Sequence, residues 1–396
     1  MYRKIVKKEW KKENPNIFHD QKIVGKEILR KFTSKTLITL CAPPQWGKTG
    51  VSLYVSYKLS LQKIQHVFYL TGMSDKTWVD QTKERVLSIW KDNIYHRNTL
   101  HRFKNRLFDL KGKQNDKNIL IIIDECHIAN KTDNMLSEIV EELGIKDIDE
   151  LKEKNIKILQ ISATPSNALI DAEKWKENHC KVVPVLSPHY VSFHTFMDNE
   201  RMKSPYELSD FRQAELFIDH FDRFPNQRYH FVRISSKGPS GKFIYHKTKT
   251  NLSIVCDKKS YDIIELNGSL DKMKVDQIYS LLSTEPPNHV IIIIKDMLGA
   301  AKTIDDTYIG CVHESTPNQK DYSSEVQGLP GRLCGWTKQK GSYSPIIFCN
   351  QEIIETYLDL YDSDFDFEEL SLWKDNKVKT NRKGEIISKS SYLSLY

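Results

Sequence analysis

The chain has 396 residues, which allows two or three domains, and its 59 lysines and arginines against 52 acids give a net charge of +7. That excess favours a polyanionic partner. The sequence has no apolar run long enough to span a membrane, no apolar signal core after residues 1–4, and no Cys-x-x-Cys pair among seven scattered cysteines, so we expect an intracellular, cytoplasmic protein without a zinc or disulfide framework.

The N-terminal segment is strongly basic. We expect it to be a solvated arm, and its basic residues are Lys4, Lys7, Lys8, Lys11 and Lys12. Gln21 follows in the polar start of a helix, Phe18-His19-Asp20-Gln21. Its amide can donate and accept hydrogen bonds at once, although a glutamine at a helix start is equally an ordinary polar residue.

The segment Thr36–Cys41 is an apolar, strand-like run, and a helix is expected over residues 50–61. Between them, the phosphate-loop pattern asks for Gly, four residues, and Gly-Lys-Ser/Thr. The last three positions match, and an alanine replaces the first glycine. In such a loop the amides and the helix start hold phosphate, the lysine reaches the terminal phosphates and the hydroxyl binds Mg²⁺. The expected nucleotide-binding residues are Ala42, Pro43, Pro44, Gln45, Trp46, Gly47, Lys48 and Thr49.

A second strand is expected at His66–Leu70, and a third, very apolar one at Ile121–Ile123. A continuous apolar run is typical of a strand buried on both faces, and ligands bind beyond the carboxyl ends of such strands. Asp124 and Glu125 follow directly, about 75 residues after the Gly-Lys-Thr. An unpaired buried charge is costly, so a metal with bound phosphate would explain them. The alternative is a strand that ends in solvated acids.

Cys126 and His127 complete this segment and by themselves suggest a metal-ligand pair. A further short strand, Ile156–Ile161, ends in Ser162-Ala163-Thr164-Pro165. Small hydroxyl side chains at a strand end can bond neighbouring carboxylates and shift when a phosphate leaves. Alone, this segment indicates only a turn after a strand.

Together, in this order and spacing, the three segments resemble the motifs of superfamily two helicases, which include the DEAD, DEAH and DExH proteins. Residues 42–49 match the first motif with Gln45 in place of the usual internal glycine, Asp124–His127 match the second in its Cys-His variant, and Ser162–Thr164 match the third. The resemblance implies an α/β fold with two tandem RecA-like domains, each a parallel sheet with helices on both faces, and ATP in the cleft between them.

The second half carries weaker matches. Strands are expected at Tyr229–Ile234, His289–Ile294 and Tyr308–His313. Residues 295–303, with Gly299, look like a divergent fifth motif. Residues 326–336 are similar to the sixth motif, but Gln327 is one residue too far from the Gly-Arg and Trp336 stands where a final arginine is usual. Arg332 is therefore the candidate arginine finger, and the alternative is a surface arginine in a loop.

The resemblance also implies roles for individual residues, with ATP and Mg²⁺ as cofactors. Thr49 and Asp124 would hold the metal, Glu125 would activate water, and Arg332 and Lys48 would act on the phosphates. Gln21 would contact adenine, and Gly299 and Gln327 would belong to the nucleotide site. The expected coupling residues are His127, Ser162, Ala163 and Thr164, and the expected nucleic-acid contacts are Thr71, Ser74, Lys76 and Gln81.

We expect a first domain over residues 1–181, a proline-punctuated linker over 182–210, a second domain over 211–361 and a charged tail over 362–396. The tail is either a frayed end or an arm on nucleic acid. The predicted function is a nucleic-acid-stimulated ATPase, a monomeric helicase or translocase of phage or large-virus type, with DNA favoured over RNA.

Two alternatives remain at this stage. A packaging-type motor fused to a nuclease would need a later cluster of carboxylates on strands to hold two metal ions. A nucleotide-binding clamp with little turnover is favoured by Ala42, Gln45 and the missing last arginine of the sixth motif.

Overall fold

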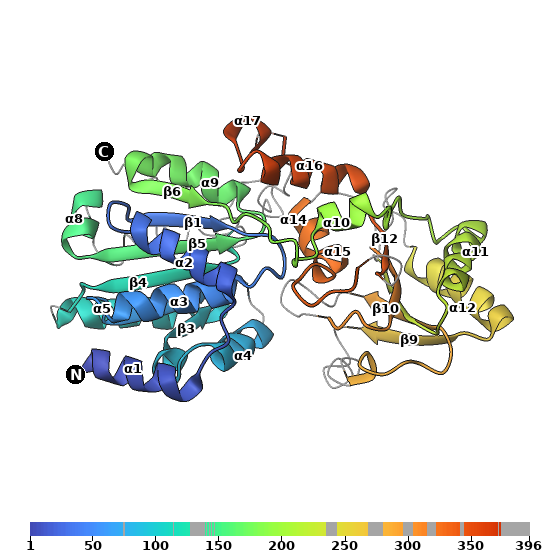
Figure 1. Ribbon diagram of the computed structural model, residues 1–396, viewed down its shortest axis with the longest axis horizontal. Coiled ribbons are helices and arrows are strands. Elements are labelled where there is room, and N and C mark those ends of the chain that lie inside the picture. Colours follow the sequence, from blue (N-terminus) through green and yellow to red (C-terminus); the bar gives the residue numbers. More distant parts are fainter. Residues whose placement is uncertain are drawn as a thin grey trace, which may run out of the picture. The chain divides into compact units, whose positions relative to one another are not determined.

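The computed structural model describes residues 1–73, 76–113, 115–126, 147–234, 244–267, 280–295, 304–314, 322–340, 344–370 and 372–373, together with Ile139, Glu141, Leu143 and Ile145. The chain forms two compact units, each built on its own sheet (Figure 1). The first comprises residues 1–43 and 47–185, and the second comprises Pro44–Trp46 and the described residues from Leu186 onward.

The first unit contains a sheet of six strands in the order β3-β2-β4-β5-β1-β6, and all of its strand pairs are parallel. The strands are β1 (Leu37–Cys41), β2 (His66–Thr71), β3 (Ile94–His96), β4 (Ile119–Asp124), β5 (Ile156–Ser162) and β6 (His179–Val182). The helices are α1 (Tyr2–Glu13), α2 (His19–Lys31), α3 (Lys48–Ser60), α4 (Lys76–Arg85), α5 (Leu100–Gly112), α8 (Ile148–Glu153) and α9 (Ser166–Ala172).

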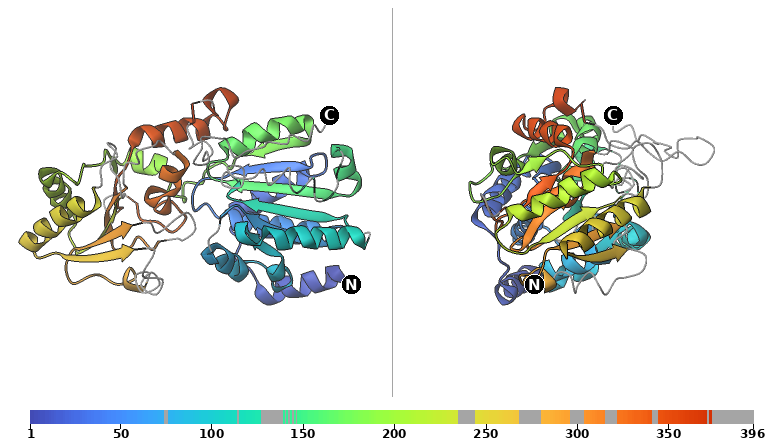
Figure 2. Two further views of the ribbon diagram at one scale, coloured as in Figure 1. Left: turned by 180° about the vertical axis from the view of Figure 1, so that it is seen from behind. Right: turned by 90° about the vertical axis from the view of Figure 1, so that its right-hand side faces the viewer.

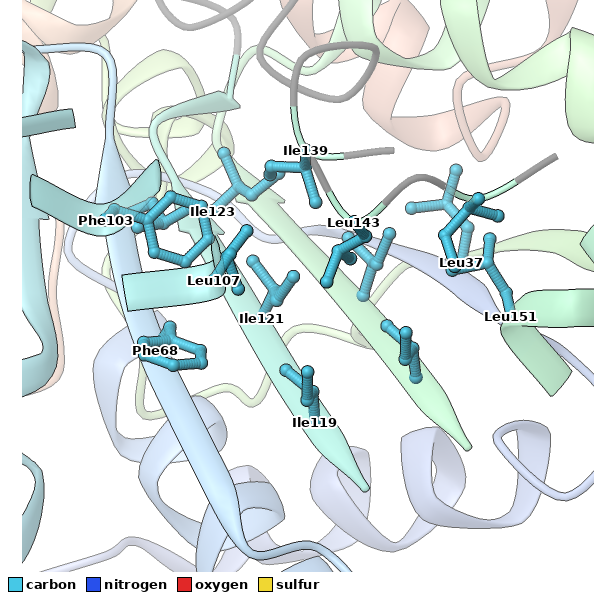
Figure 3. Close-up of a cluster of buried hydrophobic side chains, with 14 of the residues drawn as sticks. Leu37, Phe68, Phe103, Leu107, Ile119, Ile121, Ile123, Ile139, Leu143 and Leu151 are labelled. Carbon is cyan, nitrogen blue, oxygen red and sulfur yellow. The ribbon is translucent and has the colours of Figure 1, made fainter. Parts of the chain in front are cut away.

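Strand β4 shows why the apolar run in the sequence is continuous. Ile119, Ile121 and Ile123 belong to a buried cluster with side chains of α5, and Figure 3 shows Phe103 and Leu107 over this face of the strand. Alternate strand residues point to opposite faces. The intervening residues Leu120 and Ile122 are buried as well. Both faces of β4 are therefore covered, and burial of each large apolar side chain contributes about 1.5–3 kcal/mol.

The basic N-terminal segment is an ordered helix, so the expectation of a solvated arm was wrong. Val6 of α1 is buried, and the Trp10 ring stacks on Tyr57 of α3 at a centroid distance of 3.8 Å. Glu13 accepts a hydrogen bond from the Ser88 backbone N–H at 2.8 Å. The lysines of α1 are exposed. The apolar side of α1 thus packs against the rest of the first unit. The spacing of the charged residues in the sequence did not indicate this packing.

The second unit contains another parallel six-stranded sheet, in the order β7-β12-β11-β8-β10-β9. The strands are β7 (Met202–Lys203), β8 (Tyr229–Arg233), β9 (Asp262–Asn267), β10 (Val290–Lys295), β11 (Ile309–His313) and β12 (Ile346–Phe348). The helices are α10 (Phe193–Asp198), α11 (Phe211–Asp219), α12 (Tyr245–Lys259), α14 (Tyr322–Gln327), α15 (Leu329–Arg332), α16 (Gln351–Asp362) and α17 (Phe367–Leu370). In the first unit, short 3₁₀ helices cover Ser88–Asn93, Arg97–Thr99 and Glu173–Asn178; in the second unit, a short 3₁₀ helix covers His220–Arg223.

The second sheet also has a central strand that is buried on both faces. Phe217 of α11 and Leu252 of α12 pack in one buried cluster with Ile291 and Ile293 of β10. Ile292, between them, is also buried. Figures 1 and 2 show helices on both faces of each sheet. The predicted fold class, two tandem parallel α/β domains, is therefore confirmed.

Residues 182–210, predicted as a linker, contain the helix α10 and the strand β7. Met202 of β7 pairs with Ile347 of β12, so this segment supplies the edge strand of the second sheet. Residues 362–370, predicted as the start of the tail, contain α17, and residues 374–396 lie outside the described part of the chain. In the described residues, no helix combines the length and the apolar character needed to cross a membrane.

Candidate nucleotide-binding site

Three neighbouring strands of the first sheet bring the predicted motifs together. Strand β5 lies between β1 and β4, and all three are parallel. Cys41 pairs with Ser162, and Asp124 pairs with Ile161, so the strands end at the same edge. The Ala42 N–H donates to the Ser162 carbonyl at 3.2 Å. Ligands bind at such an edge in open α/β sheets.

The predicted phosphate loop joins β1 to the start of α3, as expected. Gly47 stands before the first residue of α3 with φ +98°, a left-handed conformation that favours glycine, and Gln45 has φ +59°. The Lys48 ammonium donates to the carbonyls of Ala42 and Pro43 at 3.2 and 3.1 Å. The lysine therefore lies folded over the loop, where anionic oxygens could replace these carbonyls as acceptors.

The remaining loop residues differ in their exposure. Pro43, Pro44 and Trp46 are buried, and Thr49 is partly exposed on the first turn of α3. The first turn of a helix offers backbone N–H groups that lack intrahelical partners, and the helix dipole favours negative charge there. The 13-residue helix α3 thus presents a positive end with a hydroxyl beside it.

Gln21 lies directly against this loop. Its Oε1 accepts a hydrogen bond from the Phe18 backbone N–H at 3.0 Å, which caps α2. A Cβ placed on Gly47 would come within 1.9 Å of the Gln21 Nε2, and one on Gly50 would come within 2.5 Å of its Oε1. Gly47 and Gly50 therefore leave the space that the glutamine fills. Its contact with adenine stays a prediction.

The two acids of the second motif stand at the end of β4. The Asp124 Oδ1 accepts the Glu125 backbone N–H at 3.1 Å, and its Oδ2 accepts the Trp78 indole N–H at 2.9 Å. Glu125 is 8% exposed and has φ +50°. A left-handed conformation costs a non-glycine residue about 1–2 kcal/mol. Strain of this kind gathers at functional sites, which favours a role for Glu125.

The coupling residues Ser162, Ala163 and Thr164 are also buried. The Ser162 hydroxyl accepts the Thr164 backbone N–H at 3.0 Å, so the two residues form a closed turn after β5. Ala163 is buried between them. Burial raises the pKa of the neighbouring Cys126 thiol well above its ordinary value, so the thiol stays protonated near neutral pH. His127 lies outside the described residues.

The predicted nucleic-acid contacts fall on the end of β2 and on α4. Thr71 is buried, and its hydroxyl accepts the Met73 backbone N–H at 3.3 Å. Lys76 is the first residue of α4, and Gln81 is partly exposed on the same helix. Ser74 lies outside the described residues. Thr71 would need to rearrange to contact phosphate through its side chain.

In the second unit, the similarity to the sixth motif covers α14 and α15. Gln327 is the last residue of α14, and Arg332 is the last residue of α15, with only 1% of its side chain exposed. The alternative of a surface arginine in a loop is therefore excluded, and the role of Arg332 as an arginine finger stays a prediction. Gly299 lies outside the described residues.

Two buried acids that were not identified from the sequence accept backbone hydrogen bonds at α14 and α15. The Glu314 Oε2 accepts the Leu329 backbone N–H at 2.9 Å at the start of α15, and its Oε1 lies 3.4 Å from the Arg233 Nε. The Glu325 Oε1 accepts the Asn350 backbone N–H at 2.9 Å. Burial and then the charge of Glu314 raise the pKa of Glu325 to about 8. No motif marks these acids, because their partners are backbone groups far along the chain.

Comparisons with known proteins give the following result. No protein-family model matches the chain. A curated relative, the uncharacterised protein L594 of Acanthamoeba polyphaga mimivirus, is 23% identical over 374 residues, covering 89% of this chain and 90% of the relative.

Two solved structures resemble most of the chain. The ATP-dependent Type ISP restriction-modification enzyme LlaBIII, bound to DNA, matches with a TM-score of 0.52 and 13% identity over 85% of this chain. The DEAH/RHA helicase HrpB of Escherichia coli matches with a TM-score of 0.51 and 13% identity over 84%. The chain shares the fold of these two proteins over the matched part. The matched part covers 28% of the LlaBIII chain and 43% of the HrpB chain, so it spans less than half of either solved chain.

Proposed function

We propose that this protein is a nucleic-acid-stimulated ATPase that couples hydrolysis of Mg·ATP to movement along, or remodelling of, nucleic acid. The observation that carries the proposal is the convergence of three motifs at one sheet edge. The loop with Lys48, the acids Asp124 and Glu125, and the Ser162 turn follow three adjacent parallel strands. The helicase fold found by comparison supports the same conclusion.

The residues at this edge suit both ATP and Mg²⁺. The Thr49 hydroxyl and the Asp124 carboxylate are oxygen donors, and Mg²⁺ is usually held by one or two carboxylates together with substrate phosphates. The left-handed Gly47 lets the loop turn into α3, so that backbone N–H groups face a bound anion. When bound, Mg²⁺ would offset the negative charge that develops on the phosphates.

Individual residues take distinct roles in this mechanism. Lys48 would exchange its two carbonyl acceptors for oxygens of the terminal phosphates. Glu125 would orient the attacking water and accept its proton, a role that general bases fill with contributions of about 10²–10⁴ in rate. Arg332 would supply a guanidinium to the transferred phosphoryl group, worth about 10³–10⁵ in related reactions. Gln21 would contact adenine, and Gln327 would help to hold the nucleotide.

The coupling and nucleic-acid roles complete the proposal. The Ser162–Thr164 turn and His127 would respond to loss of the terminal phosphate. The segment from Thr71 to Gln81 would contact phosphate and sugar oxygens, which carry no base information. DNA is the favoured partner, and the chain would act as a monomer. The mimivirus relative supports a setting in a virus-infected cell.

ATP turnover of four variants tests the mechanism. Lys48→Ala and Glu125→Gln remove the two central groups, and Lys63→Ala and Glu153→Gln are controls at exposed positions of the same unit. We expect Lys48→Ala and Glu125→Gln to lose at least about 10²-fold in turnover. Glu125→Gln should still bind ATP, and the controls should retain wild-type turnover. Wild-type turnover in both Lys48→Ala and Glu125→Gln would overturn the mechanism.

A further inference from the structure

Trp78 of α4 makes a contact that none of the motifs accounts for. Its side chain is 5% exposed, and its indole N–H donates to the Asp124 Oδ2 at 2.9 Å. The indole nitrogen is a donor only, so the direction of this hydrogen bond is fixed. The two residues are 46 positions apart in sequence, and Asp124 is the residue that would hold the metal.

The contact determines how the carboxylate of Asp124 is presented. A carboxylate offers about four lone-pair sites. The Glu125 backbone N–H takes one on Oδ1, and the Trp78 indole takes one on Oδ2. Two donors on different oxygens fix the carboxylate plane, and the remaining lone pairs can then serve a metal ion or its water. Such outer partners orient metal ligands, and their loss typically costs about 10–100-fold in metal affinity or activity.

Trp90 shows that burial alone does not explain the contact. Its side chain is also buried in the first unit, and its indole N–H donates to the Tyr2 hydroxyl at 3.1 Å. Both tryptophans thus fill core positions and satisfy their N–H groups. They differ in the acceptor, since only Trp78 of this pair bonds Asp124, the proposed metal ligand. Trp90 is therefore a matched control.

The position of Trp78 in the chain adds a second link. Lys76 and Gln81, two predicted nucleic-acid contacts, lie on the same helix α4. The strand before this helix pairs with β4 so that Thr71 is opposite Asp124. A shift of α4 caused by a bound strand would therefore change the hydrogen bond from Trp78 to Asp124.

We propose that Trp78 is a positioning residue that sets the Asp124 carboxylate for Mg²⁺, and that it links nucleic-acid binding on α4 to the metal. This inference rests on the proposed function of the site. It assigns to α4 a part in controlling the affinity for Mg·nucleotide, in addition to its predicted contacts with the nucleic-acid backbone.

The test measures binding rather than turnover. The binding of a fluorescent, non-hydrolysable ATP analogue to the full chain is followed by anisotropy while Mg²⁺ is titrated, in wild type, Trp78→Phe and Trp90→Phe. We expect Trp78→Phe to need about tenfold more Mg²⁺ for half-maximal binding, since it loses an outer partner of the ligand. Trp90→Phe should match wild type. All three should bind the analogue equally in EDTA, because the phosphate loop is unchanged.

A second arm adds single-stranded DNA. In wild type, saturating DNA should lower the Mg²⁺ concentration at half-maximal binding, and in Trp78→Phe that shift should disappear. If Trp78→Phe unfolds, benzothienylalanine at position 78 preserves the ring shape and removes only the N–H. A Mg²⁺ dependence identical to wild type in the folded variant would overturn the inference alone. If wild type shows no Mg²⁺-dependent nucleotide binding, the proposed function fails and the inference fails with it.

Discussion

The packing of Gln21 against α3 gives a prediction that can be worked through in numbers. Gly50 lies within α3, where alanine is favoured over glycine by about 1 kcal/mol. Yet a Cβ on Gly50 would lie 2.5 Å from the Gln21 Oε1 and 2.9 Å from its Cδ. Gly50→Ala must therefore displace Gln21 and break its hydrogen bond to Phe18, which costs about 1 kcal/mol.

These two effects offset each other only while Gln21 is present. We expect Gly50→Ala to leave the stability of α3 nearly unchanged in wild type and to raise it by about 1 kcal/mol in a Gln21→Ala background. The coupling energy between the two positions is then about 1 kcal/mol, which is within the range for residues in contact. Gly50→Ala should also weaken ATP binding in wild type and leave it unchanged in Gln21→Ala.

Hydrogen exchange of the α3 amides in the full chain measures the free energy of local opening, which avoids assuming a single unfolding transition for two domains. Gly112→Ala is the matched control, since Gly112 ends α5 and a Cβ there meets no atom within 4 Å. Its effect on α5 should be the same in both backgrounds. An equal effect of Gly50→Ala with and without Gln21 would refute the reasoning.

Three further predictions concern the second domain. Burial lowers the pKa of His313 from 6.5 to about 4, so the stability due to its neutral form is present above pH 6.5 and is lost as the pH falls towards 4. At pH 5 this protonation lowers the free energy of unfolding by about 2 kcal/mol. In His313→Gln, the free energy of unfolding in urea should therefore decrease by about 2 kcal/mol less between pH 7 and pH 5 than in wild type. An equal decrease in the two proteins would contradict this prediction. Because the pKa of Glu325 is raised from 4.5 to about 8, the stability that its protonated form contributes is present below pH 4.5 and is lost as the pH rises from 4.5 to 8. Glu325→Gln should therefore raise the thermal midpoint more at pH 9 than at pH 5. Equal shifts at the two pH values would argue against a protonated Glu325. A Cβ on Gly328 would lie 2.7 Å from the Glu314 Oε2 and 2.8 Å from the Ser324 carbonyl. Gly328→Ala should therefore lower the free energy of thermal unfolding by about 1–3 kcal/mol and also lower ATP turnover. Wild-type values for both would show that the segment between α14 and α15 is not tightly packed.

The central strands of both sheets were predictable from sequence, because a strand buried on both faces is a continuous apolar run. The run at Ile121–Ile123 lies in β4, and the run at Ile156–Ile161 lies in β5. Their order along the chain, with helices between them, also indicates parallel pairing, because parallel strands need long crossovers. The convergence of Asp124 with the phosphate loop then follows from the fold.

Other parts of the fold have no sequence pattern of this kind. Strand β7 has only two residues, Met202 and Lys203, which is too short for any periodic signal. The charges of α1 suggested solvation, and its attachment depends on Val6 and on the stacking of Trp10 over a partner 47 residues away, Tyr57.

The site contacts missed by sequence reasoning are long-range in the same way. A tryptophan in the mostly polar segment 76–85 is the one local feature that could have pointed to the bond from Trp78 to Asp124. The bond from Leu329 to Glu314 joins a backbone group to a side chain that no pattern distinguishes from a surface acid. Positions of this kind depend on tertiary packing and become visible only in the structure.

The most direct test of the central claim is the rate of phosphate release from Mg·ATP by the wild-type chain, alone and with single- and double-stranded DNA and RNA. Our account predicts slow release alone and a marked increase with at least one of these four, with DNA giving the larger effect. Turnover that is absent, or that none of the four changes, would contradict it.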